Sequence, residues 1–263
     1  MKLIRLLIGA VILTTSCIIS DPIQNWDTVF NFHDGVFMRW RYRLFVDGQL
    51  YTDVKVELKH IGYEVKDGYY CKKFVAYYVN SSTISAETAY VWYSNSDTGL
   101  ILVDIEGEHV PMPVFRNDPD GVRYRIGNRT FHSLGEIARF MNSVAWGGDG
   151  EPTQLLEPQL TLKYPPDPGS RWIVFTSPWL RTREIVGIEE VDVPAGEFYT
   201  LHLKTYDEGA PDLTIDDWIT GEAWVKKVVS SKVAVYDDQG RFIKFVTMTD
   251  ISELEEIGWG EMP

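Results

Sequence analysis

The residue types that most often carry out catalysis or hold metal ions are scattered along this chain. The five histidines stand singly, at His33, His60, His109, His132 and His202. No HExxH or HxH pattern and no cysteine–histidine pair at metal-ligand spacing is present, so the sequence predicts no metal site. The G-x-S-x-G turn of hydrolases and the glycine-rich phosphate loop are also missing, so we predict no nucleotide and no other cofactor.

Acidic side chains offer one alternative chemistry. Asp216, Asp217 and Glu222 are close together in the sequence. Two carboxyl groups that face each other across a cleft can hydrolyse a glycosidic bond. One hypothesis is therefore an envelope hydrolase that acts on glycan or lipid, and it predicts that these carboxylates converge in the folded chain.

Tryptophan is the other residue type with functional interest, since the chain has nine of them. Several lie in strand-like runs and are predicted to belong to the core: Trp40, Trp92, Trp172 and Trp224. Others lie near glycines, prolines or element ends: Trp146, Trp179, Trp218 and Trp259. An aromatic side chain in such a place can line a ligand cleft. From this group we predict Trp146, Trp179 and Trp218 as ligand-binding residues.

The first residues have the pattern of a secretory signal. A short basic start precedes an apolar run from Leu6 to Leu13, and Thr14-Thr15-Ser16-Cys17 follows. The uncharged run is shorter than the about 20 residues that span a bilayer. The residues before Cys17 resemble a bacterial lipobox, although Thr14 stands where a branched apolar residue is commoner. We expect a signal peptide over residues 1–16 and a linker over residues 17–30 with lipid on Cys17, the alternative being an ordinary cleaved signal peptide.

Lipid on Cys17 would attach the protein to a membrane of the cell envelope. Ile18 stands where some lipoproteins carry an inner-membrane retention aspartate, so we expect the outer membrane in a host with two membranes. Only one other cysteine is present, Cys71, and it can form an internal disulfide only if Cys17 carries no lipid. We predict Cys71 to be a small strand residue.

The charge of the chain argues against some partners. Its 25 basic and 38 acidic residues give a formal net charge of −13, and the acids are spread along the sequence. A protein with this balance has no bulk attraction for nucleic acid or for anionic lipid. We therefore predict no nucleic-acid partner.

Most of the chain has the alternation of antiparallel β-strands. Between Val36 and Val46, apolar residues alternate with Arg39, Arg41 and Arg43, and turn residues recur every ten to twelve positions afterwards. We predict a mainly β protein: an antiparallel meander that forms a curved sheet, half-barrel or sandwich. One β domain is expected over residues 31–252, with halves 31–115 and 160–252 joined by a segment 116–159, and an acidic tail over 253–263.

One stretch of the joining segment has helical spacing. Ser133 and Glu136 form a capping-box pattern, and apolar residues follow at helical intervals up to Gly147-Gly148. The pattern predicts an amphipathic helix over residues 133–146. Its apolar side must be buried, and the open face or end of a curved sheet is the simplest place for it.

The stretch from Leu160 to Tyr206 combines strand patterns with two turn motifs. Val193-Pro194-Ala195-Gly196 separates two alternating runs, which predicts a β-hairpin. Together with Tyr164-Pro165…Gly169-Ser170-Arg171-Trp172, it resembles the YP…GxxW and VPAGxF motifs of uncharacterised bacterial secreted lipoproteins. The resemblance covers about residues 160–250 and departs from the family pattern near Trp218–Lys226. It implies an exported protein with an antiparallel β fold, in the manner of lipoprotein carriers.

Two functional hypotheses follow. The favoured one is a non-enzymatic lipoprotein of the cell envelope that binds an apolar ligand or a partner protein on its curved sheet, and it predicts an apolar cavity under the 133–146 helix. The other is the hydrolase. Strands rich in aromatic and aliphatic residues favour the first.

Overall fold

The structure, a computed structural model, describes residues 30–79, 89–107, 121–145, 155, 157–177 and 179–260. The predicted signal peptide, Cys17 and Trp146 lie outside the described residues, as does the predicted linker except for Phe30. None of the described helices is long and apolar enough to cross a membrane.

The described residues form one helix and fourteen strands, so the predicted mainly β class is confirmed. The first strands are β1 (Val36–Val46), β2 (Gln49–Lys66), β3 (Tyr69–Val79), β4 (Ala89–Ser96), β5 (Gly99–Glu106), β6 (Arg123–Ile126) and β7 (Arg129–Phe131). The helix α2 (Leu134–Ala145) follows. The remaining strands are β8 (Gln159–Lys163), β9 (Arg171–Phe175), β10 (Arg181–Val193), β11 (Gly196–Asp207), β12 (Leu213–Ile219), β13 (Trp224–Tyr236) and β14 (Phe242–Trp259).

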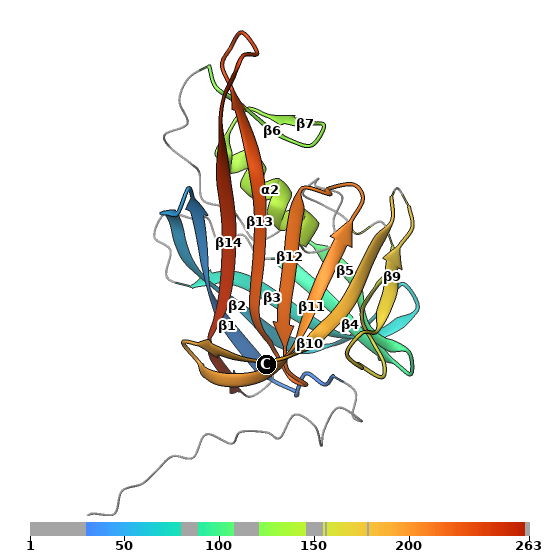
Figure 1. Ribbon diagram of the computed structural model, residues 1–263. Helices are drawn as coiled ribbons and strands as arrows, with labels where there is room; N and C mark the ends of the chain where they lie inside the picture. The colour runs from blue at the N-terminus through green and yellow to red at the C-terminus, as the bar shows by residue number, and fades with distance from the viewer. Residues whose placement is uncertain are drawn as a thin grey trace, which may run out of the picture.

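The strands form a single antiparallel sheet that curls strongly around α2 (Figure 1). Its order is β8-β5-β4-β3-β2-β1-β14-β13-β12-β11-β10-β9, with β6 and β7 beside β13. The two end strands come close to each other, because Trp172 Nε1 of β9 donates a hydrogen bond to the Leu160 carbonyl of β8 at 2.8 Å. The sheet is therefore a nearly closed half-barrel, which confirms the predicted curved antiparallel sheet.

The pairing of β1 with β14 joins the two predicted halves into one sheet. It runs from Val36 opposite Trp259 to Val46 opposite Met248. The prediction of an acidic tail over residues 253–263 is wrong as far as Trp259, because β14 continues to that residue. Glu253 and Glu256 project from the outer face of this strand and contact Arg43 and Arg39 of β1, so acidic residues stabilise the strand pairing here.

The alternation predicted for β1 is confirmed. Met38, Trp40, Tyr42 and Leu44 are buried on the concave face. The arginines between them point outward, where Arg39 lies 2.7 Å from Glu57 and Arg41 Nε lies 2.9 Å from Asp53. A strand with one apolar and one charged face must have its apolar face turned to the core.

The predicted hairpin at Val193–Gly196 is also confirmed, since β10 and β11 pair across it. Further along the chain, β12 ends at Ile219 and β13 begins at Trp224. The Thr220 N–H bonds to the Ala223 carbonyl at 2.9 Å, and the Thr220 hydroxyl accepts the Glu222 and Ala223 N–H groups. This side-chain-capped turn separates β12 from β13, because a threonine hydroxyl competes with the strand ladder for backbone N–H groups.

The helix α2 begins at the predicted cap. Ser133 Oγ accepts a hydrogen bond from the Glu136 N–H at 3.0 Å, and the Glu136 carboxylate accepts one from the His132 N–H at 2.7 Å. Its apolar side is buried, with Ile137, Phe140, Met141 and Val144 among the least exposed side chains. The helix therefore fills the concave side of the sheet, as the amphipathic pattern predicted.

The core is divided into two large apolar clusters. One gathers around Phe30, Phe32 and Phe74 and extends to the β8 and β9 strands. The other gathers around α2 and the facing parts of β1, β13 and β14. Aromatic edge-to-face contacts join side chains within the first cluster; the ring centroids of Phe30 and Phe32, for example, are 4.8 Å apart.

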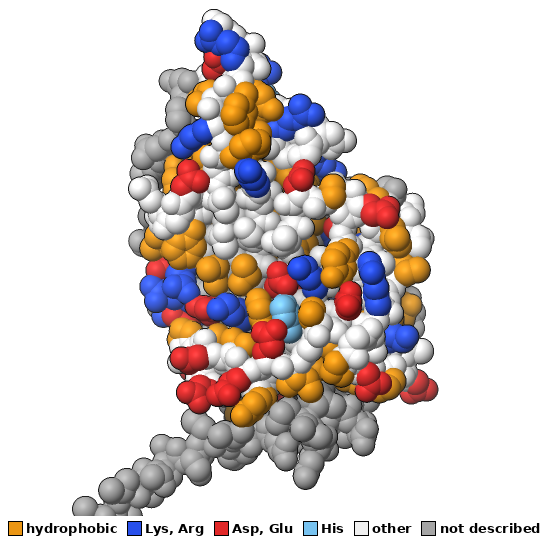
Figure 2. All heavy atoms as spheres, in the orientation of Figure 1, with side chains coloured by type: hydrophobic (Ala, Val, Ile, Leu, Met, Phe, Trp, Pro, Cys, Tyr) orange, Lys and Arg blue, Asp and Glu red, His pale blue; other side chains and the backbone are white. Residues whose placement is uncertain are grey.

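The outer surface carries mixed charge. On the face in Figure 2, acidic and basic side chains are interspersed over the β9–β13 strands. Hydrophobic side chains gather on the projecting β13–β14 hairpin, where Phe242, Ile243 and Phe245 are exposed.

Candidate functional site

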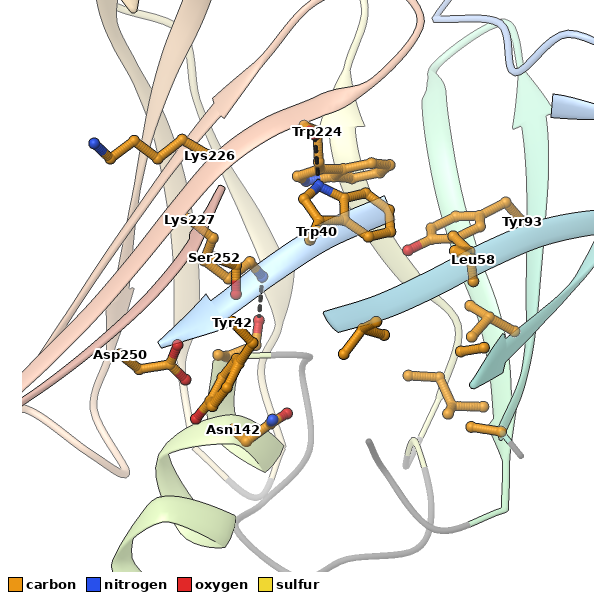
Figure 3. A pocket seen from close by; sticks show the side chains of 16 residues that line it. Trp40, Tyr42, Leu58, Tyr93, Asn142, Trp224, Lys226, Lys227, Asp250 and Ser252 are labelled. Atoms are coloured by element: carbon orange, nitrogen blue, oxygen red, sulfur yellow. Dashed lines mark hydrogen bonds between the residues drawn. The ribbon is translucent and has the colours of Figure 1, made fainter. Parts of the chain in front are cut away.

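A cavity lies between the two apolar clusters, on the concave side of the sheet (Figure 3). Side chains from β1 to β5 form one wall, including Trp40, Leu58 and Tyr93. The opposite wall comes from β13 and β14, and Asn142 and Ala145 of α2 border one side. The predicted apolar cavity under the helix is therefore present.

The cavity is small and mainly hydrocarbon. Its volume is about 70 Å³. A water-sized group needs about 10–15 Å³, so the cavity has room for about five to seven such groups. Alanines and valines at Ala76, Ala89, Val91 and Val56 leave this room because their short side chains do not reach across the sheet.

Two tryptophans shape the apolar end of the cavity. Trp40 Nε1 donates a hydrogen bond to the Trp224 carbonyl at 2.9 Å, which holds β1 against the start of β13 (Figure 3). The same interaction satisfies the polar atom of Trp40 and leaves its ring to face hydrocarbon. Both residues were expected in the core from the sequence, and they do lie there, but they also line the cavity.

A charged cluster lies beside this apolar space. The Asp217 carboxylate of β12 is fully buried, 3.4 Å from Arg183 Nη2 of β10 and 3.2 Å from Lys227 Nζ of β13. Lys227 also donates a hydrogen bond to the Ala145 carbonyl at the end of α2 (3.0 Å). Burial lowers the pKa of the Lys227 ammonium group, although the charge of Asp217 opposes this effect.

Asp250 of β14 is a second buried acid at the cavity. Its carboxyl group lies beside the phenol of Tyr42, which is on the paired strand β1 (Figure 3). Burial raises the pKa of Asp250 to about 7, with Tyr42 and Lys227 opposing the shift. Burial likewise raises the pKa of Tyr42 well above its ordinary value. Near neutral pH, Asp250 is therefore present in both its protonated and its ionised form.

A smaller cavity of about 20 Å³ adjoins the first. The two share Tyr93, Ala145, Trp224 and Lys227. The smaller one is polar, because Gln159, Thr161, Arg181 and Arg183 also line it. An apolar space thus continues into a space lined by cationic side chains.

Of the three ligand-binding tryptophans predicted from the sequence, Trp179 and Trp218 do not line these cavities, and Trp146 lies outside the described residues. Trp218 lies on the outer face of β12, stacked on His202 with ring centroids 4.5 Å apart, and donates a hydrogen bond to Glu189. Trp179 packs against Phe175 and Gly209. In β12, Asp217 and Ile219 face inward, so the residue between them must face outward.

The three acidic candidates are not brought together either. Asp216 lies on the outer face and contacts His202 Nε2 at 2.8 Å, whereas Asp217 faces the interior. Glu222 lies in the β12–β13 turn, 3.2 Å from His33. Neighbouring residues of a strand point to opposite faces, so Asp216 and Asp217 cannot face each other across a cleft. The catalytic pair predicted by the hydrolase hypothesis is therefore wrong for these residues.

The remaining candidate residues have structural surroundings. Cys71 is fully buried against Trp92 and Val103, and burial raises the pKa of its thiol, which disfavours the thiolate. Within the described ranges, no group of three or more histidine, cysteine, aspartate or glutamate side chains is arranged to hold a metal ion.

Several solved structures are similar to this chain, among them the following three. A protein with a YmcC-like fold from Bacteroides fragilis has 13% identity and a TM-score of 0.37, covering 88% of this chain and 98% of its own. A DUF1329 family protein from Desulfovibrio piger has 11% identity and a TM-score of 0.31, with 88% and 87% covered. A LolA superfamily protein from Nitrosomonas europaea has 8% identity and a TM-score of 0.29, with 88% of each chain covered.

Comparison with protein-family models and with curated proteins gave no match. TM-scores this low assign no function to the chain, so its function must be inferred from its own residues.

Proposed function

We propose that this chain is a non-enzymatic lipoprotein of the cell envelope that binds an apolar ligand in the cavity beneath α2. The observation that carries the proposal is the cavity itself, an apolar space between two well-packed clusters. Protein interiors are otherwise close-packed, so an unfilled space lined by alanine, valine and aromatic side chains is a candidate site for an apolar ligand.

The size of the cavity indicates what it can bind. Each buried methylene contributes about 0.8 kcal/mol, so about five to seven groups contribute about 4–6 kcal/mol. This corresponds to a Kd of about 0.1–1 mM before the cost of ordering the ligand. A hydrocarbon segment alone would therefore bind weakly, and a ligand held more tightly must make further contacts.

The binding hypothesis also allowed a partner protein in place of an apolar ligand on the curved sheet. The concave side favours a small ligand over a protein surface, because α2 and the inward side chains of the sheet occupy most of it. The hydrolase hypothesis is supported by no specific observation, since its three carboxylates lie in separate places.

The envelope location is proposed from the sequence. The basic start, the short apolar run and Cys17 support a lipid anchor, with the outer membrane as the site in a host with two membranes. Intact mass measurement of the protein extracted from its host's membranes tests this part. An acyl adduct on Cys17 is expected, and an unmodified cysteine would refute the anchor.

Displacement of an apolar fluorescent probe from the purified chain by decanol tests the binding proposal. About five to seven of its ten carbons fit the cavity, and the remainder extend from the open side of the cavity. The critical variant is Ala76→Phe, because Ala76 of β3 lines the cavity and a phenyl ring there fills it. Val75→Phe is the matched control, since it adds the same ring to the next residue of β3, on the opposite face.

We expect the wild-type chain and Val75→Phe to bind the probe and decanol, and Ala76→Phe to lose binding while keeping its β-sheet circular dichroism. Equal binding by all three proteins would refute the cavity as the ligand site.

A further inference from the structure

We infer that the ligand is a single-chain amphiphile with a carboxylate head group, held by Arg183 and Lys227 where the two cavities meet. This inference rests on the proposed function, because it assigns a head group to the ligand whose hydrocarbon chain occupies the apolar cavity. It adds the further contact that the weak hydrocarbon affinity requires.

The junction between the two cavities is placed to receive one end of the ligand. Lys227, Tyr93 and Trp224 line both cavities, so a chain in the apolar space points one end toward the polar one. Arg183 lines only the polar cavity. Both cationic side chains are largely buried, with side-chain exposures of 11% and 12%. An anion placed between them would be shielded from water, where charge-assisted hydrogen bonds are strong.

The charges around the polar cavity also favour an anionic head group. Arg183 and Lys227 both turn to one carboxylate, that of Asp217. Arg181 forms a separate buried ion pair with Asp207. Asp250 is a further acid near Lys227, on the paired strand β14, where it lies opposite Val229. The charged side chains that line the polar cavity are thus Arg181, Arg183 and Lys227, and two of them share one carboxylate.

The contacts of Arg183 support the same conclusion. Its Nη1 donates to the Thr161 carbonyl at 2.9 Å and its Nε donates to the Thr205 hydroxyl at 3.1 Å. These neutral acceptors hold the guanidinium in place. Its contact with Asp217, at 3.4 Å, is long for a charge-assisted bond, which is commonly about 2.7–2.9 Å. The guanidinium is thus fixed in position yet has no short bond to that carboxylate.

The size of the polar cavity selects the head group. Its volume of about 20 Å³ holds about one or two water-sized groups. The two oxygens of a carboxylate fit this space. A phosphate with its three or four oxygens, or a sugar, requires more room.

The test compares three ligands with the same chain on the wild-type protein: decanoate, decanol and decyl phosphate, each displacing the apolar probe. A charge-assisted pair of hydrogen bonds corresponds to about tenfold to hundredfold in affinity, so decanoate is expected to bind at least tenfold more tightly than decanol. Decyl phosphate is expected to bind more weakly than decanoate.

Each outcome has a distinct meaning. Equal affinities for decanoate and decanol would overturn the head-group inference and leave the proposed function intact. Tighter binding of decyl phosphate would overturn the choice of carboxylate. No binding of any of the three would overturn the proposed function itself.

Two variants locate the head group. Arg183→Met and Lys227→Met are each expected to reduce the preference for decanoate over decanol to less than threefold. Lys232→Met is the matched control, since Lys232 lies on the same strand as Lys227 but is exposed on the outer face. Circular dichroism identifies any variant that fails to fold, in which case the wild-type ligand series still decides. A full preference in both folded variants would refute the assignment to these residues.

Discussion

Replacing Asp250 with asparagine removes the buried acid of the cavity without changing its size. Asp250 lies on β14, faces Tyr42, and is surrounded by the side chains that form the apolar wall. Asparagine keeps a polar group of the same shape but cannot ionise. The substitution therefore separates the effect of the charge from the effect of packing.

The magnitude follows from the pKa of Asp250. Burial raises it from 3.8 in the unfolded chain to about 7 in the folded protein. Between about pH 4 and pH 7 the folded state consequently binds more protons than the unfolded state, so stability falls as the pH rises. Three pKa units correspond to about 4 kcal/mol. This stability is fully present below about pH 4 and is lost by about pH 7.

The prediction concerns the difference between the two proteins. Asp250→Asn should exceed the wild-type free energy of unfolding by about 1 kcal/mol near pH 4.5 and by about 4 kcal/mol near pH 8. Urea unfolding followed by tryptophan fluorescence at both pH values measures it. Taking the difference from wild type cancels the groups that do not interact with Asp250. Lys227 does interact with Asp250, but its lowered pKa gives stability the opposite slope, at higher pH.

Asp238→Asn is the control, because Asp238 is exposed in the β13–β14 turn. It should change stability by less than about 0.5 kcal/mol at either pH. A variant at position 250 that is less stable than wild type by the same amount at both pH values would refute the reasoning. That result would mean that Asp250 is ionised and held by a partner throughout this range.

Three further predictions concern the fold that surrounds the cavity. Ser133→Ala removes the N-cap of α2 and should lower the free energy of unfolding by about 1 kcal/mol; an unchanged urea midpoint would contradict the cap. Gly99→Ala places a Cβ 2.0 Å from the Leu162 carbonyl oxygen at the β5–β8 pairing, so it should lower the free energy of unfolding by about 1–3 kcal/mol or more. Gly187→Ala is the control, because the space at its Cβ is open, and it should lower the free energy of unfolding by less than about 1 kcal/mol. Thermal unfolding measures both values. Ending the chain after Ser252 removes the part of β14 that pairs with the start of β1 and should lower Tm by more than about 10 °C; a loss of less than about 2 °C would show that these residues form a tail and not a strand.

The sequence was sufficient to predict those parts of the fold that depend on local periodicity. The alternation in β1 determines which of its residues face the core, because side chains of a strand point to opposite faces in turn. The Ser133 cap and the helical spacing after it predicted α2, and Val193–Gly196 predicted the β10–β11 hairpin. In these cases the determining contacts lie within a few residues of each other.

Other features depend on residues that are distant in the sequence. The acidic residues after Ser252 have the composition of a solvated tail, and they form a strand because arginines of β1, more than 200 positions earlier, lie beside them. Similarly, Trp40 and Trp224 have the pattern of core residues, and no local signal shows that the core between them is incomplete.

The candidate site is the clearest case of this division. Arg183, Asp217, Lys227 and Asp250 come from four strands, and each is an ordinary polar residue in its own stretch of sequence. The sequence by itself determined the β class, the helix and the polarity of each strand face. Only the tertiary structure decided where the curled sheet leaves a space and which charges border it, because that depends on side chains from distant strands meeting across the concave side.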